Sequence, residues 1–312
     1  MKKISVSELK KTILAAEAER LKIRLPFRAG GAKLDRTRKA AETMTSRWMK
    51  DSGLDLDKLR ALHEQRDTEL QRLADSHKKE ALRLVGRRKN KLGIAAQGKA
   101  LSDLVGKRDF FPNPTFSLDT PFLIWSTPLL SLDSSIAPFD SWAKFRFLTS
   151  ESQGTQKVSF YFYWANPFSD YAVINAATSL SATGYLRSHA PWGFWVNTSW
   201  VDACAWFGLW FGVSSDLNPA DYSTDFLGST GAYGSLYTGG DVESTTISTG
   251  TSLSRTMFAV PPGNVVVFEV ALAVDYDNDD GNIEADFSSG DFQIACPVVV
   301  FSLLNSPPGA AA

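Results

Sequence analysis

The stretch from Asn264 to Asn305, NVVVFEVALAVDYDNDDGNIEADFSSGDFQIACPVVVFSLLN, decides the fold of this chain. It contains two long runs with the composition of β-strands, and a short acidic segment separates them. Alternation of side chains between two faces is typical of strands. We therefore predict that the two runs are the closing strands of an antiparallel β-sandwich.

The two runs differ in where they can lie in a sheet. The first, Asn264 to Tyr276, is apolar on both faces, and only Glu269 interrupts it. A strand of that kind is central in its sheet or covered on both sides. The second, Asp291 to Leu304, contains Pro297, which has no backbone N–H to donate to a neighbouring strand. It is therefore predicted to be an edge strand or to bulge at the proline.

Charge divides the 312-residue chain into two parts. Residues 1–108 hold 28 Lys and Arg against 14 Asp and Glu, whereas residues 109–312 hold 5 and 20. Eight of the nine tryptophans and all eight tyrosines lie in the second part. Opposite charge favours contact between the two parts, either within one subunit or head-to-tail between neighbours.

The basic part, residues 1–108, is predicted to be a helical docking or oligomerisation region, built as a hairpin, a bundle or a loose coiled coil. Helices are expected over residues 3–25, 34–50, 55–91 and 95–105. Their apolar stripes are thin, and His63, Arg66 and His77 interrupt the stripe of the third helix. Because a helix draws most of its stability from packing an apolar face, this region is expected to dock on another surface or on copies of itself.

The acidic part is predicted to be all-β. A linker over 109–114 leads to an antiparallel, jelly-roll-like sandwich over 115–305, and a disordered tail follows over 306–312. Short β-type runs separated by Ser, Gly, Pro and Asp indicate roughly ten to twelve strands. Residues 214–256, rich in Ser, Thr, Gly and Tyr, are predicted to be long surface loops. The fold class is thus α + β in separate regions.

Acidic residues between the two closing runs suggest a calcium site. Asp275, Asp277, Asp279 and Glu284 supply carboxylates near Gly281, and calcium takes several carboxylate ligands at once. The spacing departs from that of an EF-hand, and Asp and Asn are common in exposed turns. A solvated acidic turn is the favoured interpretation and calcium is the alternative. No other cofactor is predicted.

Aromatic residues are concentrated over residues 192–211. Most are predicted to pack in the core, because aromatic side chains are favoured in sheets. Trp192 and Trp195 flank Gly193 and are expected to be the exposed members, where an indole ring could stack on a sugar. Tyr233 and Tyr237, in the polar segment that follows, are the other candidate ligand contacts.

No catalytic signature is present in the sequence. Only His189 of the three histidines lies in the β part, and there is no phosphate-binding glycine loop, CxxC pair or HExxH motif. We therefore interpret the chain as a non-enzyme. Cys204 and Cys296 lie in apolar runs and are expected to be buried free thiols rather than a disulfide.

The sequence gives weaker evidence on the cellular compartment and on whether nucleic acid or a membrane is a partner. The N-terminus lacks the apolar core of a signal peptide, and the apolar segment Ala203 to Val213 is too short to cross a bilayer as a helix. Synthesis in the cytoplasm, with release in a particle as an option, is therefore expected. Nucleic acid is disfavoured as a partner because acids are interspersed among the positive charges, and a membrane partner is disfavoured as well.

These observations predict a structural or attachment subunit of a larger assembly, such as a phage, virus-like or tail-like particle. The helices would dock or oligomerise, and the sandwich would form a shell, a cap or a receptor-facing surface. A carbohydrate-binding sandwich with a helical anchor is the first alternative. A membrane-active pore-forming toxin is the second, because residues 245–256 alternate small polar and apolar side chains as membrane-inserting hairpins do.

Overall fold

The computed structural model describes residues 5–24, 31–88, 114–128, 130–236 and 238–305. The helix expected over 95–105, most of the linker, Tyr237 and the tail lie outside them. Three helices precede the strands: α1 (Val6–Arg24), α2 (Gly31–Asp51) and α3 (Leu56–Arg88). The strands are β1 (Thr115–Leu118), β2 (Leu123–Ser126), β3 (Ser131–Ser135), β4 (Trp142–Thr149), β5 (Gln153–Ala165), β6 (Ala172–Ala190), β7 (Asn197–Val213), β8 (Asp216–Gly234), β9 (Asp241–Val260), β10 (Val265–Asn278), β11 (Asn282–Asp286), β12 (Gln293–Ala295) and β13 (Val299–Leu303).

The strands form two antiparallel sheets, so the predicted fold class is confirmed. The five-stranded sheet has the order β2-β5-β10-β7-β8, and β10 is its central strand, as the apolar run predicts. The eight-stranded sheet has the order β1-β13-β6-β11-β4-β12, with β3 paired to β4 and β9 paired to β6. The core between the sheets is rich in phenylalanine. Phe268, for example, has its ring centroid 6.2 Å from that of Phe207 and 5.9 Å from that of Phe301.

Two sequence predictions about strands are wrong. The second closing run is not one strand, because it breaks around Pro297 into β12, which pairs with β4 and β6, and β13, which lies between β1 and β6. Residues 214–256 are not loops. They form most of β8 and β9, which pair with β7 and β6 along nearly their whole length, including residues 245–255. Long neighbouring strands supply a hydrogen-bond ladder that compensates for the weak β propensity of Ser- and Gly-rich sequence.

Local signals set the helix ends. The N–H of Glu8 donates to Ser5 Oγ at the start of α1, and the N–H of Lys58 donates to Asp55 Oδ1 at the start of α3. Gly53, with φ of 84°, reverses the chain after α2. None of the helices in the described part of the chain has the length and apolarity needed to span a bilayer.

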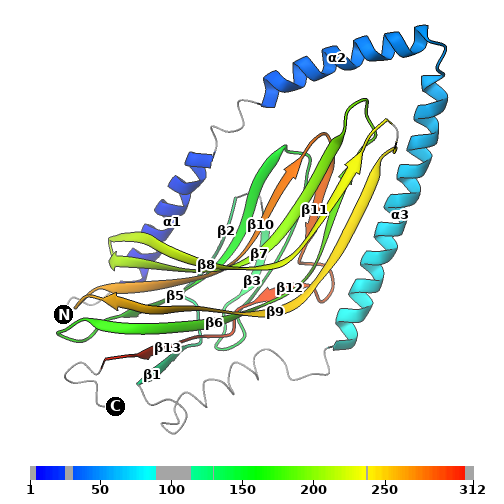
Figure 1. Cartoon of the computed structure of the whole chain (residues 1–312). Coiled ribbons are helices and arrows are strands. Elements are labelled where there is room, and N and C mark those ends of the chain that lie inside the picture. The colour runs from blue at the N-terminus through cyan, green and yellow to red at the C-terminus, as the bar shows by residue number, and fades with distance from the viewer. Residues whose placement is uncertain (1–4, 25–30, 89–113, 129, 237, 306–312) are drawn as a thin grey trace.

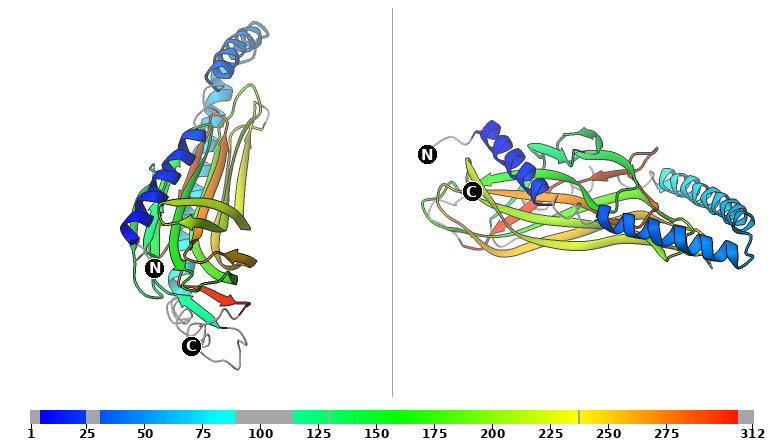
Figure 2. Two further views of the ribbon diagram at one scale, coloured as in Figure 1. Left: turned by 90° about the vertical axis from the view of Figure 1, so that its left-hand side faces the viewer. Right: turned by 90° about the horizontal axis from the view of Figure 1, so that it is seen from above.

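The helices are placed around the sandwich rather than in a bundle of their own. Helix α1 lies on one side of the sandwich and α3 runs along the opposite side, while α2 lies beyond one end (Figures 1 and 2). Helices α1 and α3 therefore dock on the β part of their own chain, as the opposite charges of the two parts favour. Cys204 and Cys296 are both free thiols, as predicted, but Cys204 is half-buried and only Cys296 is buried, which raises the pKa of Cys296 to about 12.

Candidate functional site

Helix α1 covers part of the outer face of the five-stranded sheet. Leu9 and Ile13 are fully buried there against Tyr161, Trp210 and Val267. This contact explains why β10 is apolar on both faces, because one face lines the core and α1 covers part of the other. The C-terminal half of α1 carries polar residues, and these meet the sheet where its own side chains become polar.

Four charged side chains, which we call the α1 network, join helix and sheet: Glu17 and Arg20 of α1, Lys157 of β5 and Glu269 of β10. Lys157 Nζ lies 2.9 Å from Glu17 Oε1 and 2.6 Å from Glu269 Oε1. Arg20 NH1 lies 3.1 Å from Glu17 Oε1 and 3.7 Å from Glu269 Oε2. Two cations therefore balance two carboxylates. Burial of such groups is tolerated only when charges are paired and hydrogen bonds are complete.

Neutral donors complete the α1 network. Ser159 Oγ and Trp210 Nε1 each donate to Glu269 over 2.8 Å, and the Tyr161 hydroxyl donates to Glu17 over the same distance. Burial alone would raise the pKa of Glu269, but the ammonium of Lys157 and the guanidinium of Arg20 lower it below its ordinary value. Burial and the carboxylates of Glu269 and Glu17 raise the pKa of Tyr161. The Glu269 carboxylate is therefore held as an anion, and Tyr161 as a neutral donor.

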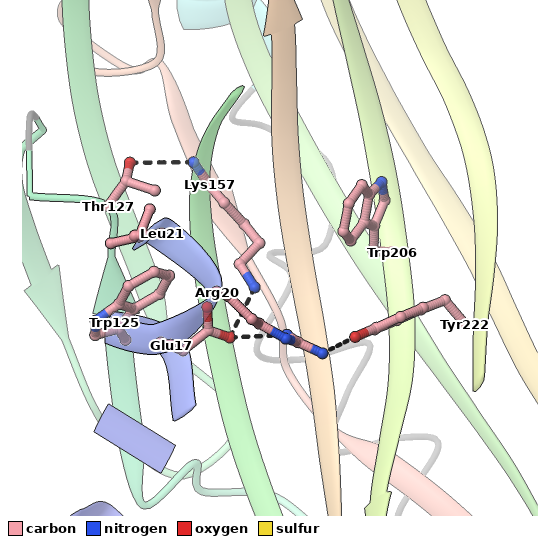
Figure 3. Close-up of a pocket in the computed structure, with 8 residues that line it drawn as sticks. All are labelled: Glu17, Arg20, Leu21, Trp125, Thr127, Lys157, Trp206 and Tyr222. Carbon is pink, nitrogen blue, oxygen red and sulfur yellow. Dashed lines mark hydrogen bonds and ion pairs between the residues drawn. The ribbon is translucent and has the colours of Figure 1, made fainter. Parts of the chain in front are cut away.

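A cavity of about 320 Å³ opens beside the α1 network (Figure 3). Its walls come from α1, β2, β5, β7 and β8, and its lining residues are Glu17, Arg20, Leu21, Trp125, Thr127, Lys157, Trp206 and Tyr222. Trp125 and Trp206 stand on opposite sides of Lys157 (Figure 3). The cavity therefore has aromatic walls on two sides and charged hydrogen-bonding groups between them.

Tyr222 forms a third aromatic wall because its neighbour on β7 is a glycine. Gly208 pairs with Tyr222, and a Cβ on Gly208 would lie only 2.7 Å from the ring. The Tyr222 hydroxyl is hydrogen-bonded to the Arg20 guanidinium, which also lies 4.4 Å from the centre of the Trp210 ring. Any larger residue at position 208 would displace the ring from this wall.

The ligand-contact residues expected from the sequence lie elsewhere. Trp192 is half-buried rather than exposed as expected, because its ring stacks on His63 of α3 with 5.4 Å between centroids. Trp195 and Tyr233 are 47% and 65% exposed, and Tyr237 is outside the described residues. Within the aromatic segment itself, Trp210 is buried, as expected for a core residue.

The four expected calcium ligands are not brought together. Asp275 and Asp277 are on β10, whereas Glu284 is on β11 in the other sheet. Glu284 is buried and paired with Lys78, Arg146 and Arg187 over 2.7 to 2.8 Å. The turn between the strands is closed by Asn278, which donates to the Gly281 carbonyl and accepts from its N–H. No three His, Cys, Asp or Glu of the described ranges are grouped as metal ligands.

Glu284 instead belongs to what we call the α3 anchor, formed by Lys78, Arg187, Glu284 and Asp286. Lys78 of α3 is ion-paired with both carboxylates, and Arg187 NH1 lies 2.8 Å from Asp75 Oδ1. The Tyr185 hydroxyl donates to the Ala74 carbonyl over 2.8 Å. Burial opposes ionisation of Asp286, but hydrogen bonds from Lys78, Ser289 and the backbone lower its pKa to about 2.

Sequence reasoning missed the cavity because its residues are scattered from position 17 to position 222. Glu269 gave the one readable signal, since a lone carboxylate in an apolar strand must find a buried partner. Lys157 lies at the polar beginning of a strand that is otherwise apolar, which is an ordinary position for lysine. The ion pair between Lys157 and Glu269 can be inferred only once β5 is known to pair with β10.

The chain matches no protein-family model and no curated protein. Among solved structures it resembles TmCBM61 in complex with β-1,4-galactotriose, with a TM-score of 0.22 and 7% identity over 58% of this chain and 87% of that one. It also resembles a family 11 carbohydrate-binding module from Clostridium thermocellum in complex with a mixed-linked tetrasaccharide, with a TM-score of 0.23 and 11% identity over 61% and 92%. TM-scores this low do not establish a shared fold, and nothing about the function of this chain follows from them.

Proposed function

We propose that this chain is a non-catalytic carbohydrate-binding protein and that the cavity beside the α1 network holds a sugar unit. The observation that carries the proposal is the pair of indole walls, Trp125 and Trp206, on opposite sides of the charged group Lys157. Ligand sites are concave, mostly apolar and fitted with a few convergent polar groups. A sugar ring matches this arrangement because it presents C–H faces to aromatic rings and hydroxyls to charged donors and acceptors.

The charge balance of the α1 network favours an uncharged saccharide. Arg20 and Lys157 are neutralised by Glu17 and Glu269, so the cavity has no unpaired positive charge for a uronate or a sulfate. An anionic sugar would compete with the two carboxylates and leave one of them buried without its partner, which is costly. Hydroxyl groups can instead bond to the outer edges of these ion pairs without separating them.

A glycan array probed with the full chain tests this proposal. We expect neutral oligosaccharides to bind, and we expect Trp206→Ala to reduce that binding at least tenfold by removing one indole wall. Trp48→Ala is the matched control, because Trp48 is an exposed tryptophan on α2 rather than in the cavity. Absence of binding to neutral glycans, or equal binding by wild type and Trp206→Ala, would refute the proposal.

A second candidate is the structural or attachment subunit, and α2 favours it. Met44 and Trp48 of α2 are 75% and 66% exposed, whereas buried apolar residues of α1 and α3 pack on their own sandwich. Large exposed apolar side chains on one element are typical of contact surfaces between proteins. In this reading α2 is the segment that joins neighbouring subunits of a particle assembled after cytoplasmic synthesis.

Light scattering of the full chain at high concentration and low salt separates the two candidates. The assembly function predicts oligomers that Trp48→Ser together with Met44→Ser converts to monomers. Leu14→Ser is the control, since Leu14 is an exposed residue of the docked helix α1. A wild-type protein that stays monomeric would count against an assembly function and would leave the carbohydrate proposal intact.

A further inference from the structure

All three histidines of the chain lie at the boundary between α3 and the sandwich. His63 and His77 are on α3, and His189 is on β6. His63 stacks on Trp192, and His77 lies 2.8 Å from Ser244 Oγ of β9. Three residues that can change charge near neutral pH are thus placed at one interface.

His63 and His189 both interact electrostatically with Asp67, and we call these three residues the histidine cluster. His189 Nε2 lies 3.8 Å from Asp67 Oδ2, which is too long for a hydrogen bond. Three polar atoms of the cluster are buried without a hydrogen-bond partner among the described residues: His63 Nε2, Asp67 Oδ1 and His189 Nε2. The turn between β8 and β9 lies directly on the cluster, since a Cβ on Gly240 would come within 2.0 Å of Asp67 Oδ1.

Charged groups from α3 and β9 surround the cluster, with two cations, Arg60 and Arg66, and three carboxylates, Asp67, Asp241 and Glu243. From α3, Arg60 lies 6.0 Å from the centre of the Trp192 ring and Arg66 donates to the Thr238 carbonyl. Asp67 and, from β9, Asp241 carry negative charges that oppose those of the arginines. Glu243 of β9 lies opposite Ser188, the residue before His189, in the pairing of β9 with β6. Arg187 on β6 is already paired with Asp75 and Glu284. Two added protons would leave the cluster with an excess of positive charge.

The direction of the effect follows from burial. Burial lowers the pKa of His189, and although Asp67 opposes this change, Arg187 adds to it. A histidine whose pKa is lower when α3 is docked stabilises docking above its ordinary pKa and weakens docking as the pH falls below that value. Burial raises the pKa of Asp67 above 3.8, so protonation of Asp67 strengthens docking, but only at lower pH.

We propose that the histidine cluster is a pH-sensitive latch that holds the N-terminal half of α3 on the sandwich and releases it below about pH 6. The C-terminal half stays attached through the α3 anchor, in which Asp286, with a pKa of about 2, keeps its charge in this range. Ala81, Val85 and Phe292 pack beside that anchor and do not titrate. Acid therefore loosens one half of a continuous helix and exposes the Trp192 ring, together with the surface that it covers.

Hydrogen exchange of the full-length protein, read by mass spectrometry as protection factors at pH 7.5 and 5.5, tests the latch. We expect residues 56–70 to lose at least tenfold in protection at pH 5.5, whereas residues 74–88 keep theirs. Equal protection of 56–70 at both pH values would overturn the proposal, and so would an equal loss in the two halves, which would indicate general acid unfolding.

Two variants assign the effect to the cluster. His63→Gln with His189→Gln should give protection of residues 56–70 that no longer depends on pH, whatever its level at pH 7.5. His77→Gln is the matched control, because His77 lies outside the cluster, and it should retain the wild-type response. A response lost in His77→Gln and kept in the double variant would contradict the assignment.

Discussion

At the scale of single residues, one hydroxyl links α3 to the larger sheet. The buried Tyr185 donates to the Ala74 carbonyl. Removing one hydrogen bond of this kind typically costs about 1 kcal/mol. We therefore expect Tyr185→Phe to lower the free energy of unfolding by about that amount in urea titrations. Tyr233→Phe, at an exposed tyrosine, should leave it unchanged, and equal effects of the two variants would argue against the contact.

Asp286 makes a pH-dependent contribution to stability. Its pKa is lowered from 3.8 to about 2, so its contribution is present above pH 3.8 and is lost as the pH falls toward 2. This difference corresponds to about 2 kcal/mol. Unfolding free energies measured between pH 5 and 2 should fall more steeply, by about that amount, in wild type than in Asp286→Asn. Parallel pH profiles for the two proteins would contradict this role.

Residue-level partners were the part of the site that the sequence could not reveal. Glu269 stood out as a single charge in an apolar strand, but Lys157 and Glu17 lie 112 and 252 positions away from it. Only strand pairing and the docking of α1 bring the three together. The same holds for Trp125 and Trp206, because their strands, β2 and β7, are separated by β5 and β10 in one sheet.

At the scale of elements, α1 offers a matched comparison between its two faces. Leu9 is fully buried on the sheet, whereas Leu14 is 43% exposed. A buried leucine truncated to alanine costs about 2–5 kcal/mol, and an exposed one costs about 0.5 kcal/mol or less. Leu9→Ala should therefore destabilise the protein strongly in urea titrations, and Leu14→Ala should not. Similar losses for both would mean that α1 does not dock through this face.

The docking face of α3 is polar, and for this reason it could not be predicted from the sequence. His63, which interrupts the apolar stripe of α3, is one of the residues that face the sandwich, together with Asp67 and Lys78. The outer face of the eight-stranded sheet is itself polar there, with Arg187, Glu284 and His189. A helix that docks on a polar surface does so through polar side chains. The spacing of its apolar residues therefore does not identify the docking face.

At the scale of the whole molecule, the division of charge was the most informative signal in the sequence. It predicted that the basic helical part and the acidic β part attract each other, and the α3 anchor realises that contact within one chain. The extent of β8 and β9 could not be predicted, because Ser- and Gly-rich sequence becomes strand here through pairing with two long neighbours.

The central structural claim is that α1 docks on the sandwich through the α1 network and so completes the cavity. A double-mutant cycle on Glu17 and Lys157 tests it most directly, with free energies of unfolding for wild type, Glu17→Gln, Lys157→Met and the double variant. Our account predicts a coupling energy of about 1–3 kcal/mol between a residue of α1 and a residue of β5. A coupling energy of zero would contradict it.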